Sequence, residues 1–331
     1  MARTLFNAMV VTEIKDKEFK MDLVERNIDE LPPGELLINV KYSSLNYKDA
    51  LSSIGNKGVT RNYPHTPGID AAGIVEESSA DDFEIGDKVI ITGYDFGMNT
   101  SGGFAEYIRV PAKWVIKLPH LLSLKESMIY GTAGFTAALS VYKLTQSGVM
   151  PSDGEILVTG ASGGVGSVAV SLLSKLGYDV VAATGKLSES EMLLKLGAKS
   201  VIDRNDIDDK SGRPMLGGRW AGVIDTVGGN ILSTAIKSTN YGGSVTCCGN
   251  VGGADFSSSV YPFILRGITV FGIDSVECPM PLRKEIWNKL SSEWKLYNLD
   301  HAVDEIGLDG LSDKIDAMLK GEHIGRTIIK L

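Results

Sequence analysis

The chain has 331 residues, of which 43% are hydrophobic and 22% charged, a composition typical of a folded globular protein with room for two domains. Its net charge of −8 at pH 7 argues against a protein that binds nucleic acid, because such binding depends on a basic surface. No run of 18 apolar residues is present and residues 1–30 lack a signal-peptide pattern, so we expect no membrane association and a cytoplasmic location.

Short β-type segments separated by Gly, Pro and Asp fill the first part of the chain. Examples are 36–42 (LLINVKY) and 84–90 (EIGDKVI), in which Gly-Asp precedes an apolar run. Their irregular spacing does not suit βαβ units, so we predict a bent antiparallel sheet or a partial barrel. Residues 44–51 (SLNYKDAL) follow the first of these strands. Their polar side chains are of types that either cap a helix or carry out chemistry.

The pattern changes at residue 123, where Ser123 and Glu126 have the spacing of a capping box at a helix start. Strands and helices then alternate over 155–275, which predicts a mainly parallel, helix-covered Rossmann sheet of about six strands. The final GRTIIKL segment is predicted to return to the first domain as a strand. We therefore predict an α/β protein with a substrate domain formed by 1–124 and 297–331, and a dinucleotide-binding domain at 125–296.

A glycine-rich loop, GASGGVG at 160–166, lies between a predicted strand and a predicted helix. Glycines there permit the tight turn and let backbone N–H groups approach a pyrophosphate at the positive end of the helix. The loop lacks the G-K-[ST] of an ATP-binding loop. Its context favours a dinucleotide site over a plain turn.

The next strand ends in AATGK, with no acidic residue of the kind that holds the ribose hydroxyls of NAD. Thr184, Gly185 and Lys186 lie there instead, and Arg204 ends the following strand. A hydroxyl and two cations suit the 2′-phosphate of NADPH. The alternative is that Lys186 and Arg204 are solvated surface charges.

The chain resembles the medium-chain dehydrogenase/reductase superfamily, and within it the zinc-free quinone oxidoreductases of the YhdH/YhfP, or acrylyl-CoA reductase, type. The resemblance covers almost the whole chain. The segments that carry it are NYKDAL, PHTPGIDAAGIV, GDKVI, GGFAEY, YGTAGFTAALS, VTGASGGVG, YPFILRGITVFGIDSVECPM and GRTIIKL.

This resemblance implies a GroES-like first domain, NADPH as cofactor and reduction of a carbon–carbon double bond conjugated to a carbonyl, with a short enoyl-CoA as small-molecule substrate. It also implies a homodimer that pairs through a strand near Ile268–Ile273, although this apolar segment equally suits a buried strand. The resemblance also implies cofactor contacts from the glycine-rich loop, namely Ser162, Gly163, Gly164 and Val165. Further contacts that it implies are Tyr47, Thr132, Thr136, Asn250, Ile264 and Ser275. Small residues such as Thr132 and Thr136 equally suit close helix packing. Ile264 suits an apolar wall, and Ser275 equally suits a cap.

Zinc enzymes of this superfamily have a cysteine ligand in the segment corresponding to SLNYKDAL and a Gly-His-Glu ligand motif further on. This chain has Asn46 in the first place and Gly68-Ile69-Asp70 in the second. His65 is nearby but lacks a thiolate partner, and the three cysteines show no C-x-x-C spacing. We therefore predict no metal.

Without a metal, a conjugated alkene is easier to reduce than a simple ketone, because its carbonyl spreads the developing charge as an enolate. Tyr47 is the candidate for contacting the nicotinamide or donating the proton, with solvent as the other proton source. Asn46 is the candidate for orienting the nicotinamide amide or the substrate. Equally, Asn46 and Asp49 are helix-capping types, and Tyr47 suits a half-buried core position. Asp49 is expected to be structural.

Three basic residues, Lys48, Lys57 and Arg61, are candidates for contacting the phosphates of a CoA substrate, or are ordinary exposed charges. Two other functions remain open. One is a quinone or enone reductase that uses the same cofactor, and the other is a dinucleotide-binding redox sensor without turnover.

Overall fold

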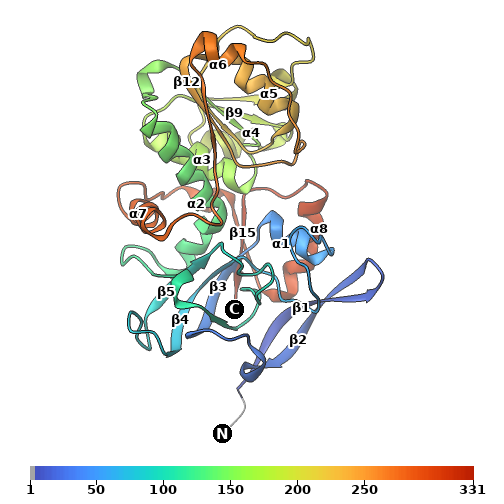
Figure 1. Cartoon of the computed structure of the whole chain (residues 1–331). Coiled ribbons are helices and arrows are strands. Elements are labelled where there is room, and N and C mark those ends of the chain that lie inside the picture. Colours follow the sequence, from blue (N-terminus) through green and yellow to red (C-terminus); the bar gives the residue numbers. More distant parts are fainter. Residues whose placement is uncertain (1–3) are drawn as a thin grey trace. The chain divides into compact units, whose positions relative to one another are not determined.

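A computed structural model describes residues 4–331, which form two compact units (Figure 1). The first unit comprises the chain up to Thr132 together with Val276–Ser291 and Val303–Leu331, and the second comprises Ala133–Ser275 and Ser292–Ala302. Relative to the domain ranges predicted from sequence, residues 125–132 and 276–291 pack with the first unit, and residues 297–302 pack with the second.

The first unit is built on a seven-stranded sheet and a separate two-stranded hairpin. All strand pairs in the two sheets are antiparallel except β14–β15. The hairpin is β1 (Leu5–Lys15) and β2 (Glu18–Asn27). The larger sheet has the order β14 (Val303–Ile306), β15 (Arg326–Lys330), β3 (Leu36–Ser44), β4 (Asp70–Ser78), β5 (Lys88–Thr92) and β7 (Val115–Lys117), with β6 (Tyr107–Val110) also paired to β3.

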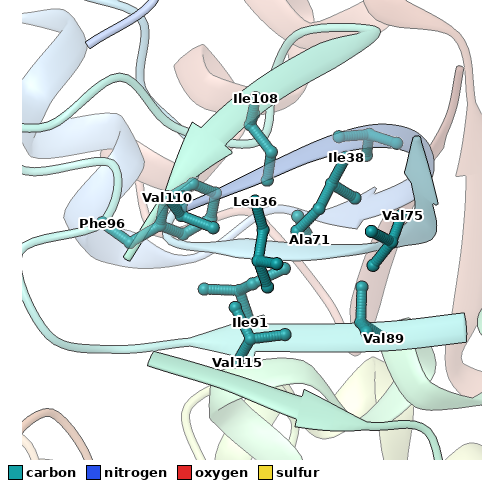
Figure 2. Packing of buried hydrophobic residues seen from close by; sticks show 11 residues of the cluster. Leu36, Ile38, Ala71, Val75, Val89, Ile91, Phe96, Ile108, Val110 and Val115 are labelled. Atoms are coloured by element: carbon teal, nitrogen blue, oxygen red, sulfur yellow. The ribbon is translucent and has the colours of Figure 1, made fainter. Parts of the chain in front are cut away.

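The register between β3 and β4 shifts twice, at Leu37/Ile38 and at Val40/Tyr42. Such irregularities increase the local twist and bend a sheet. The bent sheet encloses an apolar core to which alternate residues of its strands contribute (Figure 2). Leu36, Ile38 and Ile91 are fully buried there. The predicted bent antiparallel sheet is therefore confirmed, and so is the return of the final strand, because β15 pairs with β3.

Helices α1 (Tyr47–Ser53), α7 (Met280–Ser291) and α8 (Leu311–Leu319) belong to the first unit, which also has short 3-10 turns at Ile28–Glu30, Ala112–Trp114 and Leu308–Gly310. Leu45, just before α1, and Ala50, within α1, share an apolar cluster with Leu311 and Ile315 of α8. Arg283 of α7 is fully buried and donates to the carbonyl of Thr92 over 2.7 Å, which fixes this helix to the unit.

The second unit contains a six-stranded, entirely parallel sheet. Its order is β10 (Ser200–Asp203), β9 (Val180–Thr184), β8 (Ile156–Thr159), β11 (Trp220–Asp225), β12 (Thr239–Cys247) and β13 (Thr269–Gly272). The chain reverses direction across the sheet between β8 and β11, which makes this position the topological switch point. Strands β8, β9 and β11 are buried along their whole length, as expected when helices cover both faces.

The helices that accompany this sheet are α3 (Gly164–Lys175), α4 (Ser190–Lys195), α5 (Gly229–Ser238) and α6 (Tyr261–Arg266), with 3-10 turns at Pro151–Asp153, Leu187–Glu189, Arg204–Ile207 and Leu299–Ala302. Helix α2 (Leu124–Gln146) begins in the first unit and continues into the second. Its start has the predicted capping box, in which Ser123 and Glu126 exchange hydrogen bonds of 2.8 and 3.1 Å. The Rossmann prediction is confirmed. Among residues 4–331, no helix has both the length and the hydropathy to cross a bilayer.

Candidate functional site

The glycine-rich loop of the second unit begins at the carboxyl end of β8 and opens α3. Gly160 has φ +59°, a backbone conformation that side chains other than glycine rarely adopt. A Cβ on Gly166 would overlap the carbonyl oxygen of Gly160, so the helix approaches the turn closely. The first N–H groups of α3 have no acceptor inside the helix and lie at the positive end of its dipole. This loop therefore has the cradle that a pyrophosphate requires.

Beside this loop, Ser162 and Thr184, the last residue of β9, form a pair of polar side chains. Their hydroxyls are 2.8 Å apart, and the Thr184 hydroxyl accepts the N–H of Lys186 over 3.0 Å. The Arg204 side chain lies against Gly185, because a Cβ at that position would be 3.0 Å from Arg204 Cδ and 3.1 Å from its Nε. The side chain of Arg204 is exposed and that of Lys186 is half-buried. The structure thus brings five of the predicted cofactor residues to the ends of β8, β9 and β10.

The other predicted contacts of the second unit lie in four separate segments. Asn250 is exposed on the loop after β12, where its Cα would be 3.2 Å from a Cβ on Gly228. Thr136 is buried in α2, and Ile264 of α6 is 68% exposed. Ser275, after β13, is 9% exposed. Hydrogen bonds connect the loop of Asn250 to the loop after β11, which is itself bonded to Thr159 at the start of the phosphate loop.

In the first unit, Asn46 lies in a buried polar cluster centred on Asp70. The Asn46 amide nitrogen donates to Asp70 Oδ2 over 2.7 Å, and its oxygen accepts from Arg326 Nη1 over 3.3 Å. The Ser44 hydroxyl donates to Asp70 Oδ2 over 2.6 Å and accepts from Arg326 Nη2 over 2.9 Å. Arg326 Nη2 lies 3.9 Å from Asp70 Oδ2, and both side chains are nearly inaccessible to solvent. Both ends of the Asn46 amide are therefore engaged inside the protein.

The same carboxylate holds the start of the second half of α2. Asp70 accepts from the N–H of Thr132 over 2.8 Å and from its hydroxyl over 2.5 Å. Gly131 breaks the helix there with φ +50° and ψ −156°, and a Cβ on it would overlap Asp70 Oδ2 and Ser44 Oγ. Thr132 and Asn46, predicted separately from sequence, are therefore joined through one buried side chain.

Asp49 lies at the start of α1 and is completely buried. Its carboxylate accepts the N–H groups of Asn46, Gly68 and Ile69 over 2.8, 3.1 and 2.9 Å. Burial, and then the negative charge of Asp70, raise the pKa of Asp49 from 3.8 to about 7. Because all three donors are backbone groups, Asp49 fastens the 44–51 segment to the chain around Gly68, in agreement with its predicted structural role.

Tyr47 is the first residue of α1, and its side chain is 40% exposed. Of the basic residues near it in sequence, Lys48 is half-buried and Arg61 is exposed. Lys57 is already engaged: its ammonium lies 4.7 Å from the ring centre of Tyr63, and 3.6 Å from Glu13 Oε2. This leaves Lys57 poorly suited to contact a CoA phosphate.

A zinc site does not fit these residues. Asn46 supplies an amide in place of a thiolate, and both of its ends are hydrogen bonded. The ring of His65 is buried and its Nε2 is 2.9 Å from the Gly97 carbonyl. Across residues 4–331, no three His, Cys, Asp or Glu side chains gather in a way that would hold a metal ion.

Two residues at the centre of this cluster are not predicted from sequence, namely Ser44 and Arg326. Both lie in strands that read as ordinary apolar segments. The one available signal is an arginine at the start of the apolar run RTIIK, because a charged residue on a buried strand needs a buried partner.

Comparisons with known proteins find matches to nearly the whole chain. The model for the alcohol dehydrogenase GroES-like domain matches residues 32–120, and the model for zinc-binding dehydrogenases matches residues 164–292. The chain is 44% identical over 329 residues to "Putative quinone oxidoreductase YhfP" of Bacillus subtilis, covering 99% of both proteins. The crystal structure of YhfP with NAD bound matches with a TM-score of 0.96, over 99% of this chain and 100% of that one.

Two further proteins are similar over nearly their full length. "Probable acrylyl-CoA reductase AcuI" of Escherichia coli is 44% identical over 308 residues, which are 92% of this chain and 94% of AcuI. The crystal structure of the YhdH oxidoreductase from Salmonella enterica in complex with NADP is 41% identical, with a TM-score of 0.95, and the match covers 98% of this chain and 99% of that one.

Proposed function

Since the chain belongs to the medium-chain dehydrogenase/reductase superfamily, in its zinc-free quinone oxidoreductase branch of the YhdH/YhfP type, we propose that it is an NADPH-dependent oxidoreductase. Its proposed reaction is reduction of the C=C bond of an α,β-unsaturated carbonyl compound, with a short enoyl-CoA such as acrylyl-CoA as substrate. The observation that carries this proposal is the glycine-rich loop at the start of α3, with Ser162, Thr184 and Arg204 at one end.

NADPH, when bound, supplies the hydride for the β-carbon of the alkene. The residues of the chain bind and orient the two reactants and stabilise the enolate oxygen that the transfer creates. Tyr47 is proposed to contact the nicotinamide from the start of α1, with Thr132 and Thr136 also facing it. Because both ends of its amide are bonded to Asp70 and Arg326, Asn46 is proposed to hold the segment that carries Tyr47, and not to orient the nicotinamide amide or the substrate itself. The proton for the α-carbon then comes from Tyr47 or from solvent.

The preference for NADPH is supported by the polar side chains beside the loop. Arg204 presents a guanidinium whose planar donors match a phosphate, and Lys186 adds a second cation near Thr184. Among the relatives, one structure contains NADP and another contains NAD. Family membership alone therefore does not determine the cofactor, and the residues at the end of β9 and β10 carry the argument for NADPH. Ser162 to Val165 and Asn250 are proposed to contact the dinucleotide, Ile264 to form an apolar wall and Ser275 to be a further contact.

A quinone or enone reductase is the second candidate, because the Bacillus relative carries that name. The experiment compares NADPH oxidation by the purified protein with acrylyl-CoA, crotonyl-CoA and a simple quinone. We expect the highest kcat/KM with acrylyl-CoA. A higher value with the quinone would favour the second candidate, and tight NADPH binding without reduction of any of the three substrates would favour a redox sensor.

Replacement of Tyr47 by Phe tests its proposed contact. If the hydroxyl donates the proton, kcat falls by about 10²-fold, the lower end of the range for general acids. If it only contacts the nicotinamide, KM for NADPH rises and kcat changes little. Tyr241, which is 84% exposed, supplies the matched control Tyr241→Phe. Unchanged kcat and KM in Tyr47→Phe would remove Tyr47 from the mechanism.

We also propose a homodimer that pairs through β13. This strand ends the six-stranded sheet, and no further strand among residues 4–331 pairs with its outer edge. Apolar side chains of the neighbouring α6 are exposed, such as Leu265 at 59%. The mass in solution, measured by light scattering, is expected to be that of a dimer. Leu265→Lys should weaken the dimer, whereas Ile85→Lys, at a 74% exposed apolar residue of the first unit, should not.

A further inference from the structure

Asp225 is a buried carboxylate to which the proposed reaction gives no role. It ends β11, beside β8 at the topological switch point of the parallel sheet, and its side chain is fully buried. Burial raises the pKa of this carboxyl above its ordinary value. An acidic side chain kept in such surroundings is stabilised only by the hydrogen bonds that it makes.

Those hydrogen bonds connect two loops. Asp225 Oδ1 accepts from the Thr159 hydroxyl over 2.8 Å, and Oδ2 accepts from the N–H of Gly228 over 2.8 Å. Thr159 directly precedes Gly160, the glycine at which the phosphate loop turns. The Thr159 hydroxyl also accepts the N–H of Thr226 over 3.0 Å, and the Thr226 hydroxyl donates to the Thr159 carbonyl over 2.8 Å. Hydrogen bonds thus join the chain at the points where it leaves β8 and β11 for the two loops.

A third loop, the one after β12, is attached to the same residue. The carbonyl oxygen of Asp225 accepts from the N–H of Cys248 over 3.0 Å and from its thiol over 3.4 Å. Four residues further along, the N–H of Gly252 donates to the carbonyl of Val227 over 2.8 Å. Asn250, the proposed cofactor contact of this loop, lies between these two attachments.

We propose that Asp225 is a positioning residue for the dinucleotide, which holds the phosphate loop through Thr159 and the Asn250 loop through its own backbone. This inference rests on the proposed function. A loop whose turn is made by glycine has many alternative conformations, and the free energy of binding is reduced by the cost of ordering it. The bond between Asp225 and Thr159 removes part of that cost before the cofactor arrives.

The test is Thr159→Val, which keeps the shape of the side chain and removes the hydroxyl. The matched control is Thr239→Val, because Thr239 is equally buried and its hydroxyl bonds to the Ala235 carbonyl at the other end of the sheet. Two dissociation constants are measured, for NADPH and for 2′-AMP, which carries the adenosine and 2′-phosphate but no pyrophosphate. We expect Thr159→Val to weaken NADPH binding about tenfold and 2′-AMP binding less than twofold, and Thr239→Val to leave both unchanged.

Thr159→Ser, which keeps a hydroxyl, is expected to bind NADPH as the wild type does. Asp225→Asn tests the same hydrogen bond if the valine variant fails to fold. Asp225→Asn, which loses one of its two acceptor oxygens, is expected to weaken NADPH binding while sparing 2′-AMP. Equal NADPH affinities in Thr159→Val and Thr239→Val, or equal losses for NADPH and 2′-AMP, would overturn the inference alone. A wild-type protein that binds no NADPH would instead refute the proposed function, and this inference with it.

Discussion

The amide of Asn46 donates a 2.7 Å hydrogen bond to the carboxylate of Asp70, inside the first unit. Asn46 precedes Tyr47 on the chain, and the same carboxylate holds Thr132 at the break in α2. Two segments that are distant in sequence, and that are both proposed to face the nicotinamide, are therefore fixed by one buried charge. Arg326 compensates that charge.

Removal of this carboxylate should be costly. In Asp70→Ala, Arg326 remains buried without its nearest acid, so we expect the free energy of unfolding to fall by about 3–5 kcal/mol, measured by urea denaturation. Glu191→Ala, which breaks the exposed Glu191–Lys195 pair, serves as control and should show no measurable change. A loss below about 1 kcal/mol in Asp70→Ala would mean that the cluster does not hold the unit together.

Gly131 should tolerate no side chain. In Gly131→Ala the added methyl group would overlap Asp70 and Ser44. In addition, φ +50° is unfavourable for alanine, so the backbone conformation would itself be destabilised. Gly148 has φ +89°, and no atom lies within 4 Å of the position that a Cβ would take. Gly148→Ala therefore measures only the free-energy cost of placing alanine at a positive φ. We expect Gly148→Ala to lose about 1 kcal/mol and Gly131→Ala at least twice that amount, again by urea denaturation. Equal losses would contradict a close contact at Gly131.

The raised pKa of Asp49, about 7, has a consequence for stability. Between its ordinary pKa and about pH 7, the folded protein holds a proton that the unfolded chain has released, so this group makes the fold less stable as the pH rises through that window. Asp49→Asn cannot ionise. The free energy of unfolding of the wild type minus that of the variant should therefore fall by up to about 1 kcal/mol per pH unit across the window. A difference that stays constant would show that Asp49 is ionised throughout.

Arg204 should decide the choice between cofactors. Arg204→Ala removes the guanidinium that is proposed to meet the 2′-phosphate, so kcat/KM for NADPH should fall about tenfold or more, because charge-assisted hydrogen bonds contribute about 1.5–3 kcal/mol. The value for NADH should not change. Lys195→Ala, an exposed cation of α4 in the same unit, should leave both values unchanged. Equal losses with NADPH and NADH would count against a 2′-phosphate site.

The parts of the fold that could be predicted are those with local signals. The buried strands β8, β9 and β11 are continuous apolar runs ended by glycine or polar residues, and the Ser123 capping box marks the start of α2. The β1–β2 hairpin is not predicted, because its outer strand is largely exposed and carries many charges. Neither α7 nor α8 is predicted.

The candidate site divides in the same way. The phosphate loop is contiguous in sequence, so its residues could be named together. The cluster around Asp70 depends on pairing across the unit: Arg326 and Ser44 are 282 residues apart, and they meet only because β15 lies beside β3. The sequence predicts that the final strand returns to the first unit, but it contains no signal for the strand with which it pairs. The same holds for the bond between Thr159 and Asp225, which depends on the order of the strands.

The central claim, direct transfer of hydride to a conjugated alkene, is tested most directly with NADPH that is deuterated at C4 of the nicotinamide. Acrylyl-CoA is reduced with each of the two C4-deuterated stereoisomers, and the position of the label in propionyl-CoA is read by NMR. One stereoisomer is expected to place deuterium at C3, while the hydrogen added at C2 comes from solvent. Deuterium at C2, or its loss to water, would contradict hydride transfer to the β-carbon.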